Sequence, residues 1–285
     1  MISATVFLEH SSLMLTYPSI DPVVLSIGPL QVHWYGVMYL LGFIVAWRLA
    51  LRNSQRPWSP IKKNQVEDLI VYGAWGVILG GRLGYMFFYG ADKWLADPAM
   101  LIRIWEGGMS FHGGLIGVAI AILIYSRKYQ IPFLGLTDFV TPLVPTGLLF
   151  GRLGNFIGQE LYGRPTDMPW AMVFPADPEQ LARHPSQLYE AALEGLVMFL
   201  IINWFARKPR LYGHVTGLFL ILYGIFRFTV EFVRQPDAQF VGQSALVESF
   251  SWMTRGQTLC IPTVSYTHLR AHETPEHLVC RLLLE

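Results

Sequence analysis

Four arginines lie inside or at the ends of strongly apolar segments, where a charged side chain is costly to place. They are Arg82, Arg152, Arg227 and Arg234. An unpaired guanidinium at the centre of a membrane helix costs about 3 kcal/mol on insertion scales, so each of these arginines needs an anion. Candidate carboxylates lie in or beside the same segments: Glu160, Glu190, Glu194 and Glu231.

A phosphate group from outside the protein is the second candidate anion. The guanidinium fork binds two phosphate oxygens at once, and a phospholipid headgroup is the phosphate most available at this depth. Arg82 and Arg152 each stand in a Gly-Arg-Leu-Gly sequence, whose small residues let a bulky anion approach the backbone. The competing explanation is structural. Arg227 and Glu231 are four residues apart and can pair on one helix face, and Arg82 is then an internal counter-ion.

His112 is the candidate for proton transfer near neutral pH, because imidazole is the side chain that titrates closest to that range. It lies in a glycine-rich stretch, residues 107–117, at the start of an apolar segment. Glycine weakens a helix, so the stretch predicts close approach of the backbone to a neighbouring helix or to a ligand. The competing explanation is helix packing alone, with His112 as a satisfied interior residue.

Two further polar side chains, Tyr35 and Asn155, are candidates for orienting a headgroup hydroxyl or phosphate. Each is also a common hydrogen-bonding residue of helix contacts. The sequence shows no Ser-His-Asp set, phosphate-binding loop or metal-ligand cluster, so we expect neither a metal nor a cofactor. Both cysteines, Cys260 and Cys280, lie in an unusual C-terminal region. A thiol nucleophile, if the reaction uses one, is therefore expected to come from the substrate.

Membrane helices are the elements that must position these side chains. Hydrophobic residues make up 53% of the 285 and charged residues 14%, whereas a typical soluble domain has about 25% charged residues. Apolar segments of bilayer-crossing length recur and predict an all-α polytopic membrane helix bundle, with six transmembrane helices and a truncated seventh. The expected segments are 23–51, 66–89, 108–125, 136–157, 185–205 and 213–233. The first is expected to have an irregular or interfacial start, with a regular helix from about His33, and the fourth is interrupted by Pro142 and Pro145.

Loop charge predicts the orientation of these helices. Unbalanced basic residues follow the first, third and fifth segments, which the positive-inside rule places in the cytoplasm. The N-terminus and the loop 158–184 then face outward. Residues 1–262 are expected to form one transmembrane domain. A seventh helix begins at 258–264 and stops, and 263–285 form an atypical polar tail that we interpret as foreign sequence, with a short natural end as the alternative.

Six motifs follow one another along residues 20–262. They are His33-Trp34-Tyr35-Gly36, Gly81-Arg82-Leu83-Gly84-Tyr85, Gly108-Met109-Ser110-Phe111-His112-Gly113-Gly114-Leu115-Ile116-Gly117, Gly151-Arg152-Leu153-Gly154-Asn155-Phe156, His184-Pro185-Ser186-Gln187-Leu188-Tyr189-Glu190 and Phe232-Val233-Arg234-Gln235-Pro236-Asp237. In this order they resemble the prolipoprotein diacylglyceryl transferase family. The resemblance implies an enzyme of the bacterial inner membrane with seven helices, no cofactor and an active site near the outer face.

The same resemblance implies the reaction and its partners. The diacylglyceryl group of phosphatidylglycerol moves to the lipobox cysteine of a prolipoprotein signal peptide, which forms a thioether and releases glycerol phosphate. Membrane lipids are the other expected partner, and no nucleic acid is. Residue by residue, the motifs and their neighbourhoods imply catalytic roles for His112, Arg152, Arg227 and Tyr35 and substrate-binding roles for Asn155, Glu160, Gly163 and Glu231. From their position alone we add Arg82 and Arg234 to the substrate-binding group.

The chemistry of these residues suits that reaction. Displacement at a saturated carbon needs a thiolate, because the thiol is the weaker nucleophile, and it needs positive charge on the departing phosphate. Three other functions also fit intramembrane charges: a secondary transporter with broken helices, a phospholipid hydrolase that uses no thiol acceptor, and a non-catalytic assembly factor. A water path open in turn to both sides would favour the first, and lipid cleavage without acceptor would favour the second.

Overall fold

The computed structural model describes residues 15–28, 30–88, 97–103 and 108–235. The chain divides into two compact units, and each is described by itself. The first unit takes in Met1–Ala46, Pro142–Lys208 and Val215–Glu285, and the second takes in Trp47–Thr141 and Pro209–His214. Within the described residues, five helices have the length and apolar composition needed to cross a membrane: Trp34–Asn53, Lys63–Phe87, Phe133–Ile157, Ser186–Phe205 and His214–Glu231. The chain is thus mainly helical, as expected.

The first expected segment starts irregularly, as expected, and the irregular part is a pair of strands. Residues Val23–Ile27 (β2) and Leu30–His33 (β3) pair as an antiparallel hairpin, and helix α2 runs from Trp34 to Asn53. The regular helix near His33 is therefore confirmed, but the preceding apolar run is extended. Short apolar runs do not distinguish strand from helix by periodicity. The expected seventh helix and the polar tail lie outside the described residues.

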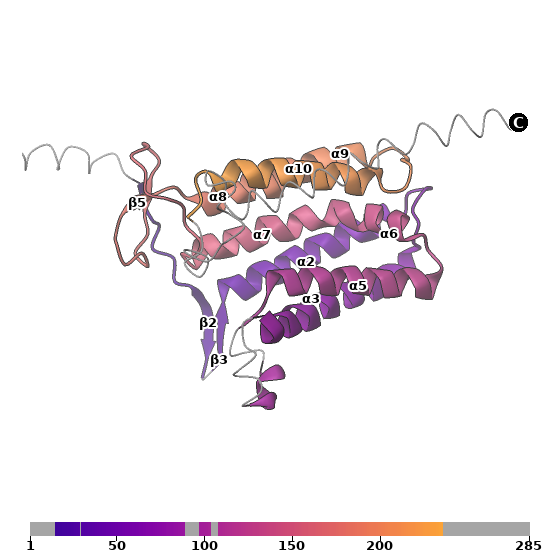
Figure 1. Cartoon of the computed structure of the whole chain (residues 1–285), viewed down its shortest axis with the longest axis horizontal. Helices are drawn as coiled ribbons and strands as arrows, with labels where there is room; N and C mark the ends of the chain where they lie inside the picture. The colour runs from indigo at the N-terminus through magenta and orange to yellow at the C-terminus, as the bar shows by residue number, and fades with distance from the viewer. Residues whose placement is uncertain (1–14, 29, 89–96, 104–107, 236–285) are drawn as a thin grey trace, which may run out of the picture. The chain divides into compact units, whose positions relative to one another are not determined.

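The second unit is built on two helices, α3 (Val66–Phe88) and α5 (Phe111–Tyr129), which lie side by side in Figure 1. A Cβ atom added to Gly117 of α5 would lie 2.1 Å from the carbonyl oxygen of Gly76, and one on Gly80 would lie 2.4 Å from that of Gly113. The close approach predicted from the glycines is therefore made to a neighbouring helix. The third expected segment does form α5, although α5 is not among the five candidate spans. The remaining elements of this unit are η1 (Lys63–Gln65), η2 (Pro98–Leu101) and α6 (Phe133–Val140).

Two of the expected segments depart from a regular α-helix. The fourth expected segment is broken as the prolines predicted: α6 is followed by η4 (Thr141–Leu143) and α7 (Val144–Ile157), because Pro142 and Pro145 have no backbone N–H for the helical ladder. The fifth consists of α8 (Ser186–Glu190), a π-helical stretch η5 (Ala191–Val197) and α9 (Met198–Phe205). The sequence did not predict the π-helical stretch.

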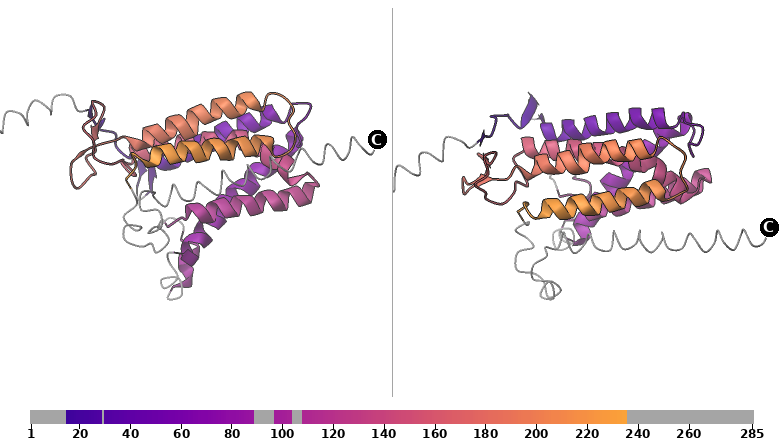
Figure 2. Two further views of the ribbon diagram at one scale, coloured as in Figure 1. Left: turned by 45° about the horizontal axis from the view of Figure 1, so that its top comes forward. Right: turned by 90° about the horizontal axis from the view of Figure 1, so that it is seen from above.

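Side chains of α9 and of α10 (His214–Glu231) form one apolar cluster of the first unit, and the two helices run side by side in Figures 1 and 2. A second cluster, Tyr17, Met172 and Phe174, lies in the loop region with the small sheet β1 (Leu15–Thr16), β4 (Met172–Val173) and β5 (Ala182–Arg183), in the order β1-β4-β5. The Tyr17 hydroxyl donates to the carbonyl of Ile157 (2.9 Å). This bond fixes the segment before α2, which carries Tyr17, to the end of α7.

Candidate functional site

A cluster of three arginines and three glutamates is buried in the first unit. Arg152 comes from α7, Glu190 from the end of α8, Glu194 from η5, Arg227 and Glu231 from α10, and Arg234 from the segment after α10. Glu190 and Glu194 have side chains 1% and 0% exposed, whereas Arg152, the most open member, is 19% exposed. Residues far apart in the chain thus make one charge-balanced site, named here the arginine cluster.

Glu190 is the centre of the arginine cluster. Its Oε2 lies 2.5 Å from Nε of Arg152, and its Oε1 lies 3.5 Å from Nη1 of Arg227 and 3.6 Å from Nε of Arg234. Arg227 also donates through Nη2 to Oε2 of Glu231 at 2.8 Å, which confirms the pairing expected from their spacing. Protein carboxylates therefore supply anions to the three arginines.

A tight contact between α7 and η5 brings Arg152 and Glu190 together. Gly195 lies against Leu149 so closely that an added Cβ would be 2.8 Å from the Leu149 Cα atom. Leu149 precedes Arg152 by three residues, so both lie on the same face of α7. The small residue on η5 is what allows two charged helix faces to meet.

Asn155 and Glu160 form the turn that follows α7. Asn155 is buried, and its Nδ2 donates to Oε2 of Glu160 at 3.3 Å, while the Glu160 amide donates to the Asn155 carbonyl at 2.9 Å. Gln187 on α8 holds the turn by donating to the Glu160 carbonyl at 2.7 Å. Glu160 is exposed and has this amide partner, so among the four candidate carboxylates it is the one that the arginine cluster does not include.

Gly163 joins the loop to the segment that carries Arg234. The two residues form an isolated antiparallel bridge, and the Gly163 amide donates to the His184 carbonyl at 2.8 Å. A Cβ on Gly163 would lie 2.6 Å from the carbonyl oxygen of Val233 and 2.7 Å from the His184 side chain. Gly163 has room for backbone only, so its contribution to the site is to hold the backbone of Arg234.

Tyr35 lies in the first turn of α2 and packs on α7. Its ring is within 3.0 Å of where a Cβ of Gly154 would be, and its hydroxyl is 3.1 Å from that of Tyr39. Both tyrosines are more than two-fifths exposed: 43% for Tyr35 and 44% for Tyr39. Tyr39 was missed by sequence reasoning, although its spacing of four residues from Tyr35 places both on one helix face.

The remaining two candidates, His112 and Arg82, belong to the second unit. His112 is exposed in the first turn of α5, where Ser110 caps the helix by accepting from the Gly113 amide at 3.2 Å. Arg82 is 2% exposed and donates to the backbone carbonyls of a nearby loop. Those carbonyls belong to Leu101 (3.3 Å), Gly108 (3.0 Å), Arg103 (3.0 Å) and Met100. These contacts favour a structural role for Arg82, and its assignment to substrate binding stays a prediction.

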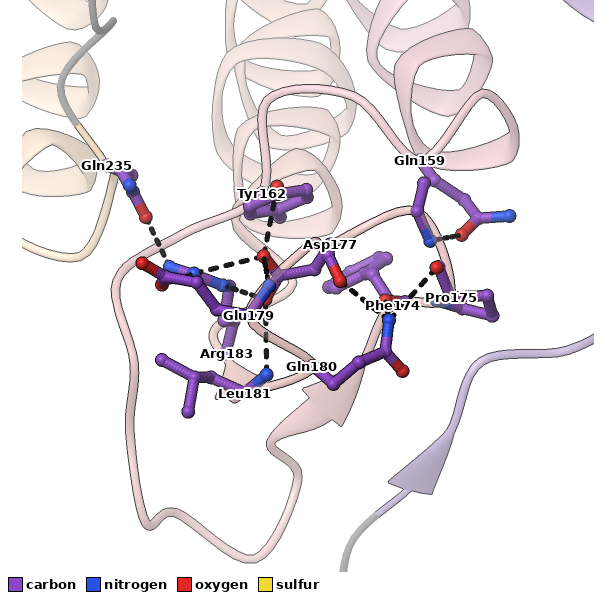
Figure 3. Close-up of polar contacts among 11 residues, drawn as sticks. Gln159, Tyr162, Phe174, Pro175, Asp177, Glu179, Gln180, Leu181, Arg183 and Gln235 are labelled. Carbon is purple, nitrogen blue, oxygen red and sulfur yellow. Dashed lines mark hydrogen bonds and ion pairs between the residues drawn. The ribbon is translucent and has the colours of Figure 1, made fainter.

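A second buried ionic group, centred on Arg183 of β5, lies in the loop between α7 and α8 (Figure 3). Arg183 is 2% exposed and donates hydrogen bonds to Asp177 through Nε (2.5 Å) and Nη2 (3.2 Å). It also donates hydrogen bonds to Glu179 and Gln235. Burial alone would raise the pKa of Asp177, but hydrogen bonds from Arg183 and from two backbone amides outweigh it and lower that pKa. Gln235 follows Arg234 directly, so this group, which sequence reasoning missed, also fixes the segment after α10.

The arrangement is suited to anion chemistry. Among the residues that the structure describes, no group of three or more His, Cys, Asp or Glu is arranged to hold a metal ion. The Nε group of Arg152 contacts Glu190, and the side chain is partly exposed, so its terminal nitrogens can reach a second anion. Preorganised guanidinium groups of this kind stabilise negative charge that develops on a leaving group.

Comparison with known proteins identifies the family. A family model described as prolipoprotein diacylglyceryl transferase matches residues 22–269. A phosphatidylglycerol--prolipoprotein diacylglyceryl transferase of Teredinibacter turnerae is 56% identical over 261 residues, which is 88% of this chain and 89% of the relative. The enzyme of the same name from Methylococcus capsulatus is also 56% identical, over 89% of this chain and 95% of the relative. The chain therefore belongs to the prolipoprotein diacylglyceryl transferase family.

Proposed function

We propose that this protein transfers the diacylglyceryl group of phosphatidylglycerol to the lipobox cysteine of prolipoproteins, the first step of bacterial lipoprotein maturation. The names of its relatives state the donor lipid and the prolipoprotein acceptor. The observation that carries the proposal is the convergence of three arginines from separate segments on one buried site. Such a site suits the phosphate of the donor lipid, which must leave with its negative charge stabilised.

The reaction exchanges one bond for another. The cysteine thiolate attacks the glyceryl carbon that bears the phosphate, a C–S bond forms, the C–O bond breaks, and glycerol phosphate leaves with the electron pair. The charge on the leaving oxygen grows during this step, so contacts with the arginines strengthen in the transition state. Arg152 and Arg227 are the proposed phosphate ligands, and Arg234 is held beside them through Glu190.

The other candidate residues receive supporting roles in this proposal. Tyr35 offers a partly exposed hydroxyl, and the bonded pair Asn155 and Glu160 offers an amide and a carboxylate at the end of α7. The proposed acceptor of the thiol proton is the exposed imidazole of His112, the role that the family resemblance implies. The low water content of a membrane site keeps hydrolysis from competing with the thiol.

The proposed location is the bacterial inner membrane, with several helices crossing the bilayer. The basic loops support an orientation with the N-terminus and the loop 158–184 outside, and we propose an active site near the outer face. The expected seventh helix and the polar tail, residues 263–285, stay predictions.

A membrane assay tests the function directly. Membranes containing this protein receive phosphatidylglycerol and a lipobox peptide, and mass spectrometry looks for a diacylglyceryl thioether on the cysteine. We expect the thioether with wild-type protein and with Arg207→Ala, because Arg207 is exposed beyond α9, and none with Arg152→Ala. Release of diacylglycerol or glycerol phosphate without the peptide would indicate a phospholipid hydrolase instead.

A further inference from the structure

The π-helical stretch η5 lies in the middle of a membrane-length helix, between α8 and α9. π-Helical turns are rare and occur frequently at functional sites. This one carries two features of the arginine cluster: Gly195, which lets α7 approach, and Glu194, which faces Arg227. The proposed function gives Glu194 no role.

The environment of Glu194 is unusual for a carboxylate. Its side chain is 0% exposed, and within the described residues neither of its oxygens has a hydrogen-bond partner. The nearest guanidinium nitrogen is Nη1 of Arg227, at 4.0 Å from Oε1 of Glu194. Burying a carboxylate without a hydrogen bond destabilises a protein, so Glu194 does not stabilise the fold by itself.

Arg227 is held differently at its two ends. Nη2 makes a 2.8 Å hydrogen bond with Glu231, which fixes one side of the guanidinium. Among the described residues Nη1 has no hydrogen-bond partner, and two carboxylates lie near it, with Oε1 of Glu190 at 3.5 Å and Oε1 of Glu194 at 4.0 Å. Glu194 therefore competes for Nη1 with Glu190, which also contacts Arg152 and Arg234.

We propose that Glu194 is a positioning residue for Arg227: its buried carboxylate keeps Nη1 away from Glu190 and available to a phosphodiester oxygen. The inference rests on the proposed function, since it assigns the phosphate of the donor lipid as the ligand of that nitrogen. Without the charge of Glu194, Nη1 closes on Glu190 and the leaving phosphate loses one of its donors. The loss falls mainly on the transition state, where the phosphate carries the most charge.

Three variants separate positioning from stability. Glu194→Gln removes the charge with almost no change of shape, Glu194→Asp keeps the charge on a shorter side chain, and Glu67→Gln is the control, an exposed carboxylate in the first turn of α3. Each purified protein is tested for its melting temperature in detergent. Its kcat and KM are then measured with a lipobox peptide in mixed micelles of varied phosphatidylglycerol content. The kcat is expressed per molecule of folded enzyme.

We expect Glu194→Gln to lower kcat about tenfold to a hundredfold, as for other small misplacements of a catalytic group, with a smaller change in KM and no loss of melting temperature. Glu194→Asp should retain more activity than Glu194→Gln. Wild-type kcat in Glu194→Gln, or loss of activity in step with loss of folded protein, would overturn the proposal. If Glu194→Gln does not fold, the test rests on Glu194→Asp. A lowered kcat at a normal melting temperature then supports the positioning role of Glu194, and a wild-type kcat contradicts it. Absence of any thioether with wild-type protein would instead refute the proposed function, and this inference with it.

Discussion

Nε of Arg152 lies 2.5 Å from Oε2 of Glu190, and the two residues come from different helices, α7 and α8. Glu190 is buried, whereas Arg152 is the most exposed arginine of the cluster. The ion pair therefore holds the guanidinium through Nε, and the terminal nitrogens are the ones proposed to bind a phosphate. Orientation of this kind lets an arginine bind a phosphate without reorganisation during the reaction.

Replacing Arg152 separates its charge from its shape. Arg152→Ala should abolish transfer, because both the phosphate ligand and the nearest partner of Glu190 are lost. Arg152→Lys should retain a small part of the activity, since an ammonium group supplies the charge but cannot form the bidentate hydrogen bonds of a guanidinium. The measurement is thioether formation per inserted protein, with Arg207→Ala as the control. Wild-type turnover by Arg152→Ala would show that Arg152 is not a phosphate ligand.

Replacing Glu190 should damage stability as well as activity. Three guanidinium groups lie within 3.6 Å of its carboxylate, so Glu190→Gln leaves the buried cluster with an excess positive charge. Removing one partner from a buried ion pair costs about 3–5 kcal/mol. We expect a clearly lower melting temperature in detergent than for wild type or Glu67→Gln. An unchanged melting temperature would show that Glu190 is not the centre of the cluster's electrostatics.

The contact between Gly195 and Leu149 is expected to be essential for the site. Gly195→Ala places a methyl group 2.8 Å from a backbone atom of α7, so the two helices must separate and Arg152 must move away from Glu190. The matched control is Gly147→Ala on α7, where no heavy atom lies within 4 Å of the added Cβ. Ala at that position should be neutral or stabilise the helix by about 0.5–1 kcal/mol.

Transfer activity and melting temperature of both glycine variants test this contact. Gly195→Ala should lose both, and Gly147→Ala should keep both. Equal behaviour of the two variants would mean that the α7–η5 contact does not position the site.

Local sequence patterns predicted the parts of this molecule that depend on neighbouring residues. The breaks at Pro142 and Pro145 follow from the missing N–H groups, and the pair Arg227–Glu231 follows from a spacing of four residues. Apolar length predicted most of the spans, and the irregular start expected before His33 is a hairpin whose strands were not predicted. These features need no knowledge of distant segments.

The features that sequence reasoning missed depend on contacts between distant segments. Glu190 was one of four candidate carboxylates, and only the packing of α7, α8 and α10 makes it the common partner of three arginines. Arg82 was expected to need an anion, but backbone carbonyls of its own unit accept its hydrogen bonds. The π-helical turn at Ala191–Val197 was not predicted, because its residues apart from Gly195 are tolerated in an ordinary α-helix.

Acid should weaken the loop between α7 and α8 through Asp177. The pKa of Asp177 is lowered in the folded protein, so its carboxylate contributes stability above about pH 4, its ordinary value, and the contribution is lost as the pH falls through the lower folded value. Protonation of Asp177 also leaves the guanidinium of Arg183, which is 2% exposed, without the charged partner that accepts two of its hydrogen bonds.

The melting temperature of the purified protein, measured from pH 7 to pH 2, tests this prediction. Asp177→Asn should lower stability at pH 7 and show a shallower loss in acid than wild type, whereas Asp167→Asn, an exposed residue of the same loop, should follow wild type. Parallel acid curves for wild type and Asp177→Asn would show that the Arg183–Asp177 pair does not control the acid stability of the loop.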